Sequence, residues 1–338
     1  MDPAYGGSTY RKAITDYVHL PESNGMNVIV EMHLNAPGSQ KATSQQKMAD
    51  ADHAPAFWCS VTARFGTDGA VVFDLYNEPH DISWACWLHG CTLPEGWKAV
   101  GMQSLVNAVR GAGGQNILML GGLGWSGDLT MWGAYMPSDP LGQLVASWHV
   151  YNFGSCVTRS CWNANVTGVG GLAPILLGEF GETDCKHTFV DPLMAWADGR
   201  GLGYVAWTWD DWGGCNGPTV ITNYDGTPSG FGQGVHDHYV ARFPRPPLKT
   251  ARGSVPGDRI RGEPGRLGRD DAELFPADIE HDPTAVGLKD GPGRAERLQA
   301  ADLRLDVVRL DVEVDARLGG LRLRHLLDQQ AQAARDMS

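Results

Sequence analysis

The stretch AVVFDLYNEPH, residues 70–80, carries apolar side chains on consecutive positions before the polar residues Asn77 and Glu78. Residues 174–179, PILLGE, repeat this arrangement and end in Glu179. Consecutive rather than alternating apolar residues are typical of strands that are buried on both faces, as in parallel sheets. The two stretches therefore predict parallel strands that each deliver a carboxylate where the strand ends.

Four further apolar runs have the same character. They are VIVEMH from Val28, ILML from Ile117, LVASWH from Leu144 and GYVAWTW from Gly203. Helix-like segments lie between several of these runs, and the patterns of residues 8–20, 97–113 and 189–201 predict three helices. Strands that alternate with helices in this way indicate a parallel α/β fold.

Polar residues of catalytic type end these strands, as on the active face of a TIM barrel. They are His33, Asn77, Glu78, His149, Tyr151, Glu179 and Trp207. The first strand is not followed by the Gly-rich phosphate turn of a doubly wound sheet. Residues 1–27 already hold a helix, whereas one βαβ unit takes about 30 residues. We therefore expect an α/β fold, a TIM (β/α)8 barrel that lacks its first two strands and exposes the edge of the strand at Val28.

The composition changes near residue 246. Residues 246–338 contain no Trp, Cys or Tyr and are rich in Arg, Asp, Gly and Pro. So few large apolar groups do not offset the entropy cost of ordering such a segment. We predict a barrel domain over residues 1–245 and a low-complexity linker and tail over residues 246–338. Within the tail, residues 302–326 alternate polar and apolar side chains, which favours a short hairpin over a helix.

The chain has 338 residues, with 27 Lys and Arg against 39 Asp and Glu and a net charge of −12. This balance argues against nucleic acid or an anionic membrane as the main partner, because both attract a basic face. No run approaches the ~18 consecutive apolar residues of a membrane span. The opening residues, MDPAYGGSTYRK, do not form a basic-then-apolar leader. All twelve Trp lie between Trp58 and Trp212, where they either fill a core or stack on sugar rings.

Glu78 and Glu179 each follow an apolar strand, where a single carboxylate would serve as a salt-bridge partner. Hydrolysis of a glycosidic bond needs two carboxyl groups, one that protonates the leaving oxygen and one that attacks the anomeric carbon or activates water. Because both strands end in Glu, and Asn77 directly precedes the first, the pattern favours this chemistry over two separate salt bridges.

Seven motifs follow one another along the chain. They are NVIVEMHLNAPGS (27–39), DADHAPAFW (50–58), FDLYNEPH (73–80), ILMLGGLGWSGDL (117–129), SWHVYNF (147–153), ILLGEFGE (175–182) and YVAWTWDDW (204–212). In this order they resemble glycoside hydrolase family 5, the cellulase-type TIM barrels of clan A, from about Pro3 to Phe243.

The resemblance implies a role for each matching residue. Glu78 matches the acid/base, and Glu179 matches the nucleophile that forms a glycosyl-enzyme. Asn77 matches the residue that hydrogen-bonds the sugar 2-hydroxyl, and Trp207 matches the indole beneath the distorted sugar. The other implied substrate-binding residues are His33 beside the cleaved bond, His149 and Tyr151 near the two carboxyl groups, and Trp125 as a subsite platform.

Several of these positions have alternatives. Trp209 and Trp212 follow Trp207 closely, so either is an alternative stacking residue, and core packing would explain Trp125 equally well. Glu182 lies beyond the apolar run and is interpreted as a charge in the first turn of a helix.

The group Asp50, Asp52 and His53 suggests a metal, but no other residue supports one. We therefore expect no metal and no cofactor.

Six of the seven Cys can be paired by position. The predicted disulfides are Cys86–Cys91, Cys156–Cys161 and Cys185–Cys215, with Cys59 free. The first two close short loops just after strands, and the third joins loops after neighbouring strands. Zinc is disfavoured because no CxxC spacing occurs. Three disulfides indicate an oxidising compartment, so we expect a secreted protein.

These inferences predict retaining hydrolysis of β-1,4-glycosidic bonds in a polysaccharide. Cellulose or another β-glucan is the first candidate substrate and β-mannan the alternative, and we expect the protein to act as a monomer. The Arg that family members carry at the end of the second strand is missing with that strand, and Leu34 replaces a common aromatic residue. A non-catalytic carbohydrate-binding protein is therefore the second hypothesis.

Overall fold

The computed structural model describes residues 7–212 and 217–242, together with the backbone of residues 307–311. All six predicted strands are present. They are β1 (Asn27–Glu31), β2 (Val71–Asp74), β5 (Leu118–Gly121), β6 (Leu144–Tyr151), β7 (Ile175–Gly181) and β8 (Gly203–Ala206). They pair in this order, and every pair is parallel. The prediction of a TIM-type α/β fold with six visible barrel strands is confirmed.

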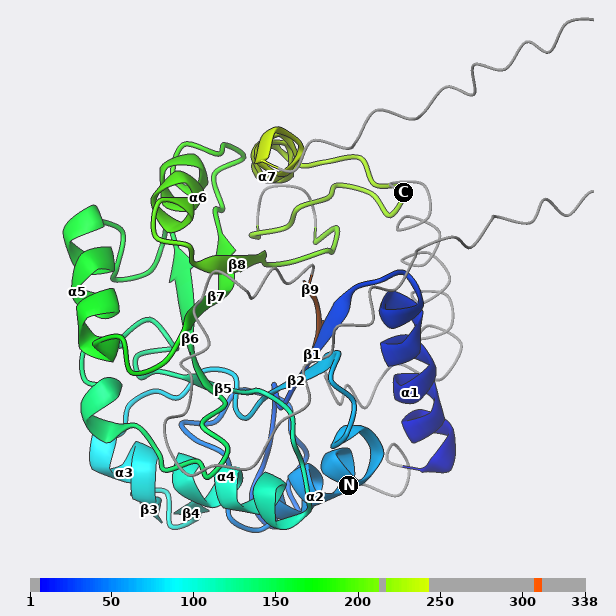
Figure 1. The fold of residues 1–338 in the computed structure, drawn as a ribbon, viewed down its shortest axis with the longest axis vertical. Coiled ribbons are helices and arrows are strands. Elements are labelled where there is room, and N and C mark those ends of the chain that lie inside the picture. Colours follow the sequence, from blue (N-terminus) through cyan, green and yellow to red (C-terminus); the bar gives the residue numbers. More distant parts are fainter. Residues whose placement is uncertain (1–6, 213–216, 243–306, 312–338) are drawn as a thin grey trace, which may run out of the picture. The chain divides into compact units, whose positions relative to one another are not determined.

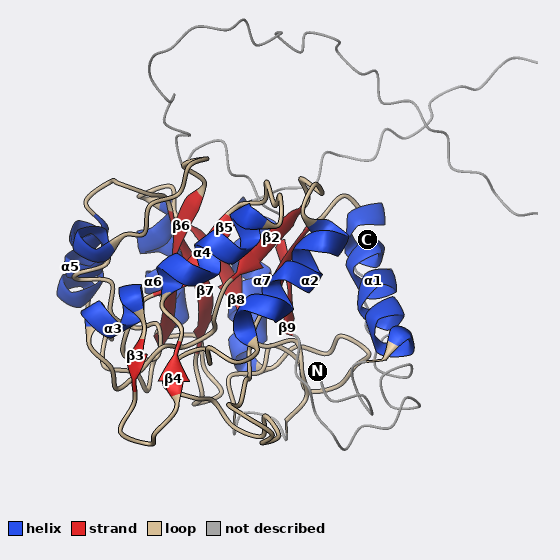
Figure 2. Ribbon diagram, turned by 90° about the horizontal axis from the view of Figure 1, so that it is seen from below, coloured by secondary structure: helices blue, strands red, loops and turns tan. Residues whose placement is uncertain are grey.

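Helices lie on the outer side of this curved sheet (Figures 1 and 2). They are α1 (Ser8–Ser23), α2 (Ala54–Phe65), α3 (Trp84–His89), α4 (Met102–Gly111), α5 (Arg159–Val169), α6 (Val190–Asp198) and α7 (Gly230–Arg242), with a short 3-10 helix, η1, at Gly133–Tyr135. None of these helices is long and apolar enough to cross a membrane.

The helix predicted over residues 97–113 is too long at its start. Residues Lys98–Ala99 form strand β4, which pairs antiparallel with β3 (Cys91–Thr92), and α4 begins only at Met102. Pairing with a segment that comes earlier in the chain overrides the local helical pattern here.

Two apolar clusters fill the fold. The larger one lies between the sheet and the helices and includes the fully buried Trp58, Trp87, Trp132 and Trp148. These four indoles serve the core. The smaller cluster joins one residue from each of five strands: Ile29, Val72, Met119, Val145 and Leu176.

Two residues further along three of these strands, the chain switches from apolar to polar. Glu31, Asp74 and Ser147 are all buried, and the Ser147 hydroxyl donates to Asp74 over 3.3 Å. Positions two apart on a strand share a face. The inner face of the sheet is therefore apolar in its middle and polar toward its carboxyl end.

The edge of β1 is covered, contrary to the expectation from the sequence. Strand β9 (Val307–Asp311) pairs with β1 in parallel, from Asn27 opposite Val307 to Glu31 opposite Asp311. Cα atoms of β8 and β9 also approach within 8 Å, and Figure 1 shows β9 between β1 and β8. The expected exposed edge is therefore wrong.

These five residues lie within the segment 302–326, for which the sequence favours a short hairpin over a helix, and they extend the barrel sheet. The rest of residues 246–338 lies outside the described part of the chain. The boundary between residues 1–245 and 246–338 stays a prediction.

Candidate active site

The structure brings Glu78 and Glu179 together at the carboxyl end of the sheet. Glu78 lies four residues after β2, and Glu179 lies within β7. Ligand-type atoms of Glu78, His149 and Glu179 all lie within 4.8 Å of one another. Two carboxyl groups that are far apart in sequence thus face a common space, with one imidazole between them.

His149 joins the two carboxylates. Its Nδ1 lies 2.9 Å from Oε1 of Glu78 and 3.2 Å from Oε2 of Glu179. Burial disfavours a charged imidazole, but the carboxylates of Glu179 and Glu78 outweigh burial and raise the pKa of His149 to about 10. The two carboxylates therefore favour the charged form of His149, which offsets part of their negative charge.

Tyr151 holds Glu179 from the neighbouring strand. The Tyr151 hydroxyl donates to Oε2 of Glu179 over 2.5 Å. The register of β6 and β7 shifts between Trp148 and His149, so that His149 lies opposite Glu179 and Tyr151 lies opposite Gly181. This irregularity positions both His149 and Tyr151 beside the carboxylate of Glu179.

Asn77 is buried and its backbone joins three segments. Its N–H donates to the carbonyl of Met32 over 3.1 Å, and its own carbonyl accepts a hydrogen bond of 2.7 Å from the Ser126 hydroxyl. These contacts tie the end of β2 to the segments that follow β1 and β5. The backbone beside Glu78 is therefore fixed from both sides.

His33 and Trp207, which follow β1 and β8, stack on each other. Their ring centroids lie 5.5 Å apart and the planes differ by 5°. Of the three indoles after β8, Trp207 is the one that stacks on His33. Trp209 packs against the core, and Trp212 is 49% exposed and meets Trp207 with the ring planes 62° apart.

Glu31 is a member of the site that the sequence analysis missed. It is completely buried, and its Oε2 lies 3.1 Å from Nδ1 of His33. Ligand-type atoms of Glu31, His33 and Glu179 lie within 4.8 Å of one another. The available signal was a carboxylate inside the apolar run VIVEMH, two residues before His33 and on the same strand face.

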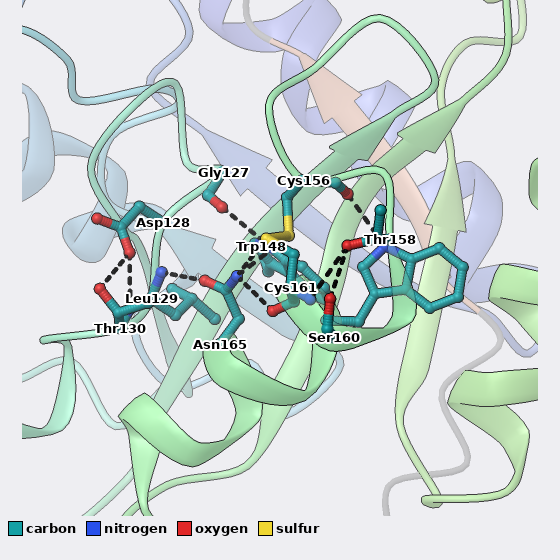
Figure 3. Close-up of a disulfide and its surroundings, with 11 residues drawn as sticks. Gly127, Asp128, Leu129, Thr130, Trp148, Cys156, Thr158, Ser160, Cys161 and Asn165 are labelled. Atoms are coloured by element: carbon teal, nitrogen blue, oxygen red, sulfur yellow. Dashed lines mark hydrogen bonds between the residues drawn. A yellow bond between two sulfur atoms is a disulfide. The ribbon is translucent and has the colours of Figure 1, made fainter.

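Trp125 lies on an exposed but well-anchored loop after β5. Its indole is 48% exposed and stacks on His80, with ring centroids 3.6 Å apart. Further along, the Trp148 indole N–H donates to the Gly127 carbonyl, and Oδ1 of Asn165 accepts from the backbone N–H of Leu129 (Figure 3). The exposed side of Trp125 does not serve core packing.

Two of the predicted disulfides are present, Cys86–Cys91 and Cys156–Cys161. The second joins the loop after β6 to the start of α5 and lies beside Asn165, as Figure 3 shows. Cys185 is disulfide-bonded, and its predicted partner Cys215 lies outside the described residues. Cys59 is free and exposed, as expected.

Glu182 has a structural role, but it lies between β7 and α6 and not in the first turn of a helix, as the sequence analysis interpreted it. Its Oε2 accepts hydrogen bonds from the backbone N–H groups of Phe189 and Val190, where α6 begins. A carboxylate at a helix N-terminus satisfies free N–H donors and complements the helix dipole.

Asp50 is also structural, because it accepts from the backbone and Nδ1 of His53 and from the side chain of Asn35. Among the described residues, the groups with ligand-type geometry at the carboxyl end of the sheet are the two sets around Glu179.

A comparison with protein families assigns the chain to one of them. The sequence profile described as "Cellulase (glycosyl hydrolase family 5)" matches residues 1–213.

The chain belongs to glycoside hydrolase family 5.

Relatives of this family 5 chain include an endoglucanase and a mannosidase. A manganese-dependent endoglucanase from Phanerodontia chrysosporium is 30% identical over 132 residues, which are 37% of this chain and 31% of the relative. A mannan endo-1,4-beta-mannosidase from Streptomyces lividans is 29% identical over 205 residues, 57% of this chain and 48% of the relative. The chain thus spans less than half the length of these two curated relatives.

A solved structure supports the family 5 fold. An endo-beta-1,4-glucanase from Xanthomonas axonopodis pv. citri superimposes with a TM-score of 0.54 at 18% identity, over 71% of this chain and 82% of that one. At this identity the likeness concerns the fold alone.

Proposed function

We propose that this family 5 chain hydrolyses β-1,4-glycosidic bonds in a polysaccharide with retention of configuration at the anomeric carbon. The observation that carries the proposal is the approach of Glu78 and Glu179 to within 4.8 Å at one end of the sheet. Retaining glycosidases hold their carboxyl groups ~5–5.5 Å apart, whereas inverting enzymes leave room for a water between them.

The two carboxyl groups would act in turn. Glu78, as the acid, protonates the leaving glycosidic oxygen while the carboxylate of Glu179 attacks the anomeric carbon and forms a glycosyl-enzyme. Glu78, now a carboxylate, then takes a proton from water, and the resulting hydroxide displaces Glu179 from the sugar. Both groups return to their starting protonation states, so the cycle balances.

The residues around the pair would orient the reacting groups. The hydrogen bond from Tyr151 and the charge of His149 fix the direction of the Glu179 carboxylate. Asn77 directly precedes Glu78, where the resemblance to the family implies a contact with the sugar 2-hydroxyl. We assign the remaining sugar contacts to His33, Trp207 and Trp125.

A β-glucan is the first proposed substrate and β-mannan the second. Both are supported by named relatives, an endoglucanase and a mannan endo-1,4-beta-mannosidase. The disulfides Cys86–Cys91 and Cys156–Cys161 favour an oxidising compartment, and we propose that the protein is secreted.

The test is to substitute each proposed catalytic carboxylate. We expect Glu78→Gln and Glu179→Gln to lower hydrolysis of carboxymethylcellulose and of mannan by about a thousandfold or more, at a temperature where circular dichroism shows that both variants are folded. Glu95→Gln, in an exposed carboxylate paired with Lys47, is the control and should keep full activity. Retained activity in either catalytic variant would contradict the assignment.

NMR of the first product formed should show the β-anomer, and initial release of the α-anomer would contradict retention. Binding of polysaccharide by the wild-type chain without turnover would support the non-catalytic alternative.

A further inference from the structure

The described part of the chain exposes aromatic rings at one end of the barrel. Among the described Trp, Tyr and Phe residues, the exposed ones are Trp125, Phe153 and Trp212. They lie on the loops that follow β5, β6 and β8. In a parallel sheet these loops share the carboxyl end with Glu78 and Glu179. Exposed apolar rings gathered on one face mark a binding surface.

Phe153 is the most exposed of the three, at 63%. It lies flat against Tyr151, with ring centroids 4.8 Å apart and planes 21° from parallel. Because Tyr151 in turn donates to Glu179, the Phe153 ring is separated from the proposed nucleophile by a single side chain. Because one face of Phe153 lies against Tyr151, a ligand would stack on the opposite face, at the rim of the site and not against the reacting carboxylate.

The loop around Phe153 is held in place on both sides. Oδ1 of Asn152 accepts from the backbone N–H and the hydroxyl of Thr183, at 3.2 and 3.3 Å. The N–H of Gly154 donates back to the Tyr151 carbonyl, and the Cys156–Cys161 disulfide follows at once. A ring that is already held in position loses little conformational entropy when a ligand covers it.

The other two exposed rings also lie against a second ring. Trp125 stacks on His80, and Trp212 meets Trp207 with centroids 6.2 Å apart. In the sheet order, β7 with Glu179 lies between β6, which leads to Phe153, and β8, which leads to Trp207 and Trp212. Exposed rings therefore lie on both sides of the proposed nucleophile.

We propose that Phe153 is a sugar-stacking residue at the rim of the site, which binds one hexose ring of the β-1,4-linked polysaccharide away from the point of cleavage. This inference rests on the proposed function, because it takes the same substrate. The apolar face of a pyranose ring covers an exposed aromatic ring, and the polar rim of the sugar stays in water. Stacking of this kind contributes to polymer binding and leaves the proton transfers of the two carboxyl groups unchanged.

The experiment separates binding from turnover. In a Glu78→Gln background, affinity electrophoresis through gels that contain hydroxyethylcellulose or glucomannan measures binding without hydrolysis. We expect Phe153→Ala to weaken retardation by about three- to tenfold and Phe153→Trp to restore it. The matched control is Leu172→Ala, because Leu172 is similarly exposed, at 58%, but lies before β7 at the opposite end of the sheet.

In the otherwise wild-type chain, Phe153→Ala should raise KM for the polymer by a similar factor. Its kcat on a short aryl cellobioside and its pH profile should stay unchanged. Equal retardation of Phe153→Ala and Leu172→Ala would overturn the inference while leaving the proposed hydrolysis intact.

A loss of kcat on the aryl cellobioside would also overturn it, because Phe153 would then act by holding Tyr151. Self-association that Phe153→Ala abolishes, with unchanged polysaccharide binding, would instead identify a contact between copies of the chain. Absence of hydrolysis in the wild-type chain, with retardation that depends on Phe153, would contradict the proposed function and support the stacking site.

Discussion

The hydroxyl of Tyr151 donates a hydrogen bond to Oε2 of Glu179 over 2.5 Å, so that β6 holds the carboxylate carried by β7. We expect Tyr151→Phe to lower kcat by about 10- to 100-fold, because a hydrogen bond to a charged group contributes roughly 1.5–3 kcal/mol. Steady-state kinetics on carboxymethylcellulose measure this loss. The phenyl ring of the variant preserves the stacking against Phe153, so polymer KM should change little. An unchanged kcat would show that the hydrogen bond does not assist the reaction.

Because the pKa of His149 is raised in the folded chain, we expect its contribution to the free energy of unfolding to depend on pH. Burial lowers its pKa, but Glu179 and Glu78 raise it to about 10 in the folded chain, against ~6.5 when unfolded. A raised pKa stabilises the fold fully below pH ~6.5, and this contribution is lost as the pH rises through about 10. It amounts to at most about 5 kcal/mol.

The measurement is urea unfolding at pH 6 and at pH 10. We expect His149→Gln to be less stable than wild type at pH 6, and the difference to shrink by pH 10. The exposed His236→Gln is the control. A difference that stays constant with pH would contradict the charged state of His149.

Glu179 and Glu182 are three residues apart and should respond in opposite ways. Glu182 accepts from two backbone N–H groups at the start of α6, so Glu182→Ala should lower the free energy of unfolding by about 1–3 kcal/mol. Its kcat should remain near that of wild type at temperatures where it is folded. Glu179→Gln should lose its activity even where it is folded. Chemical denaturation and activity assays on both variants check the contrast, and loss of kcat in folded Glu182→Ala would place Glu182 in the reaction.

The pairing of β9 with β1 implies that the C-terminal region protects the edge of β1. Residues Val307–Asp311 pair with Asn27–Glu31, and unpaired edge strands associate with other chains. We expect Val308→Pro to promote concentration-dependent association, because proline cannot donate to a ladder and is poorly tolerated in a paired strand. Sedimentation velocity at several concentrations, with Val308→Thr as the control, measures this. A monodisperse Val308→Pro chain with unchanged stability would contradict the pairing.

The sequence could locate the strands and their polar ends because both are local patterns. A run such as ILLGE is buried on both faces wherever it is placed in a parallel sheet, and the residue at its carboxyl end comes to the common edge. The loop disulfide Cys156–Cys161 is equally local, since its two residues are close in the chain. These features followed from residue order alone.

Tertiary structure decided the features that depend on partners distant in the chain. Residues Lys98–Ala99 form a strand because Cys91–Thr92 lies beside them, and β9 lies at β1 although about 275 residues separate them. The meeting of Glu31, His33 and Glu179 likewise depends on how the sheet curves to bring β1 and β7 toward each other. Side-chain periodicity fixes which face a residue occupies, whereas the distance between residues on different strands depends on strand order, register and curvature.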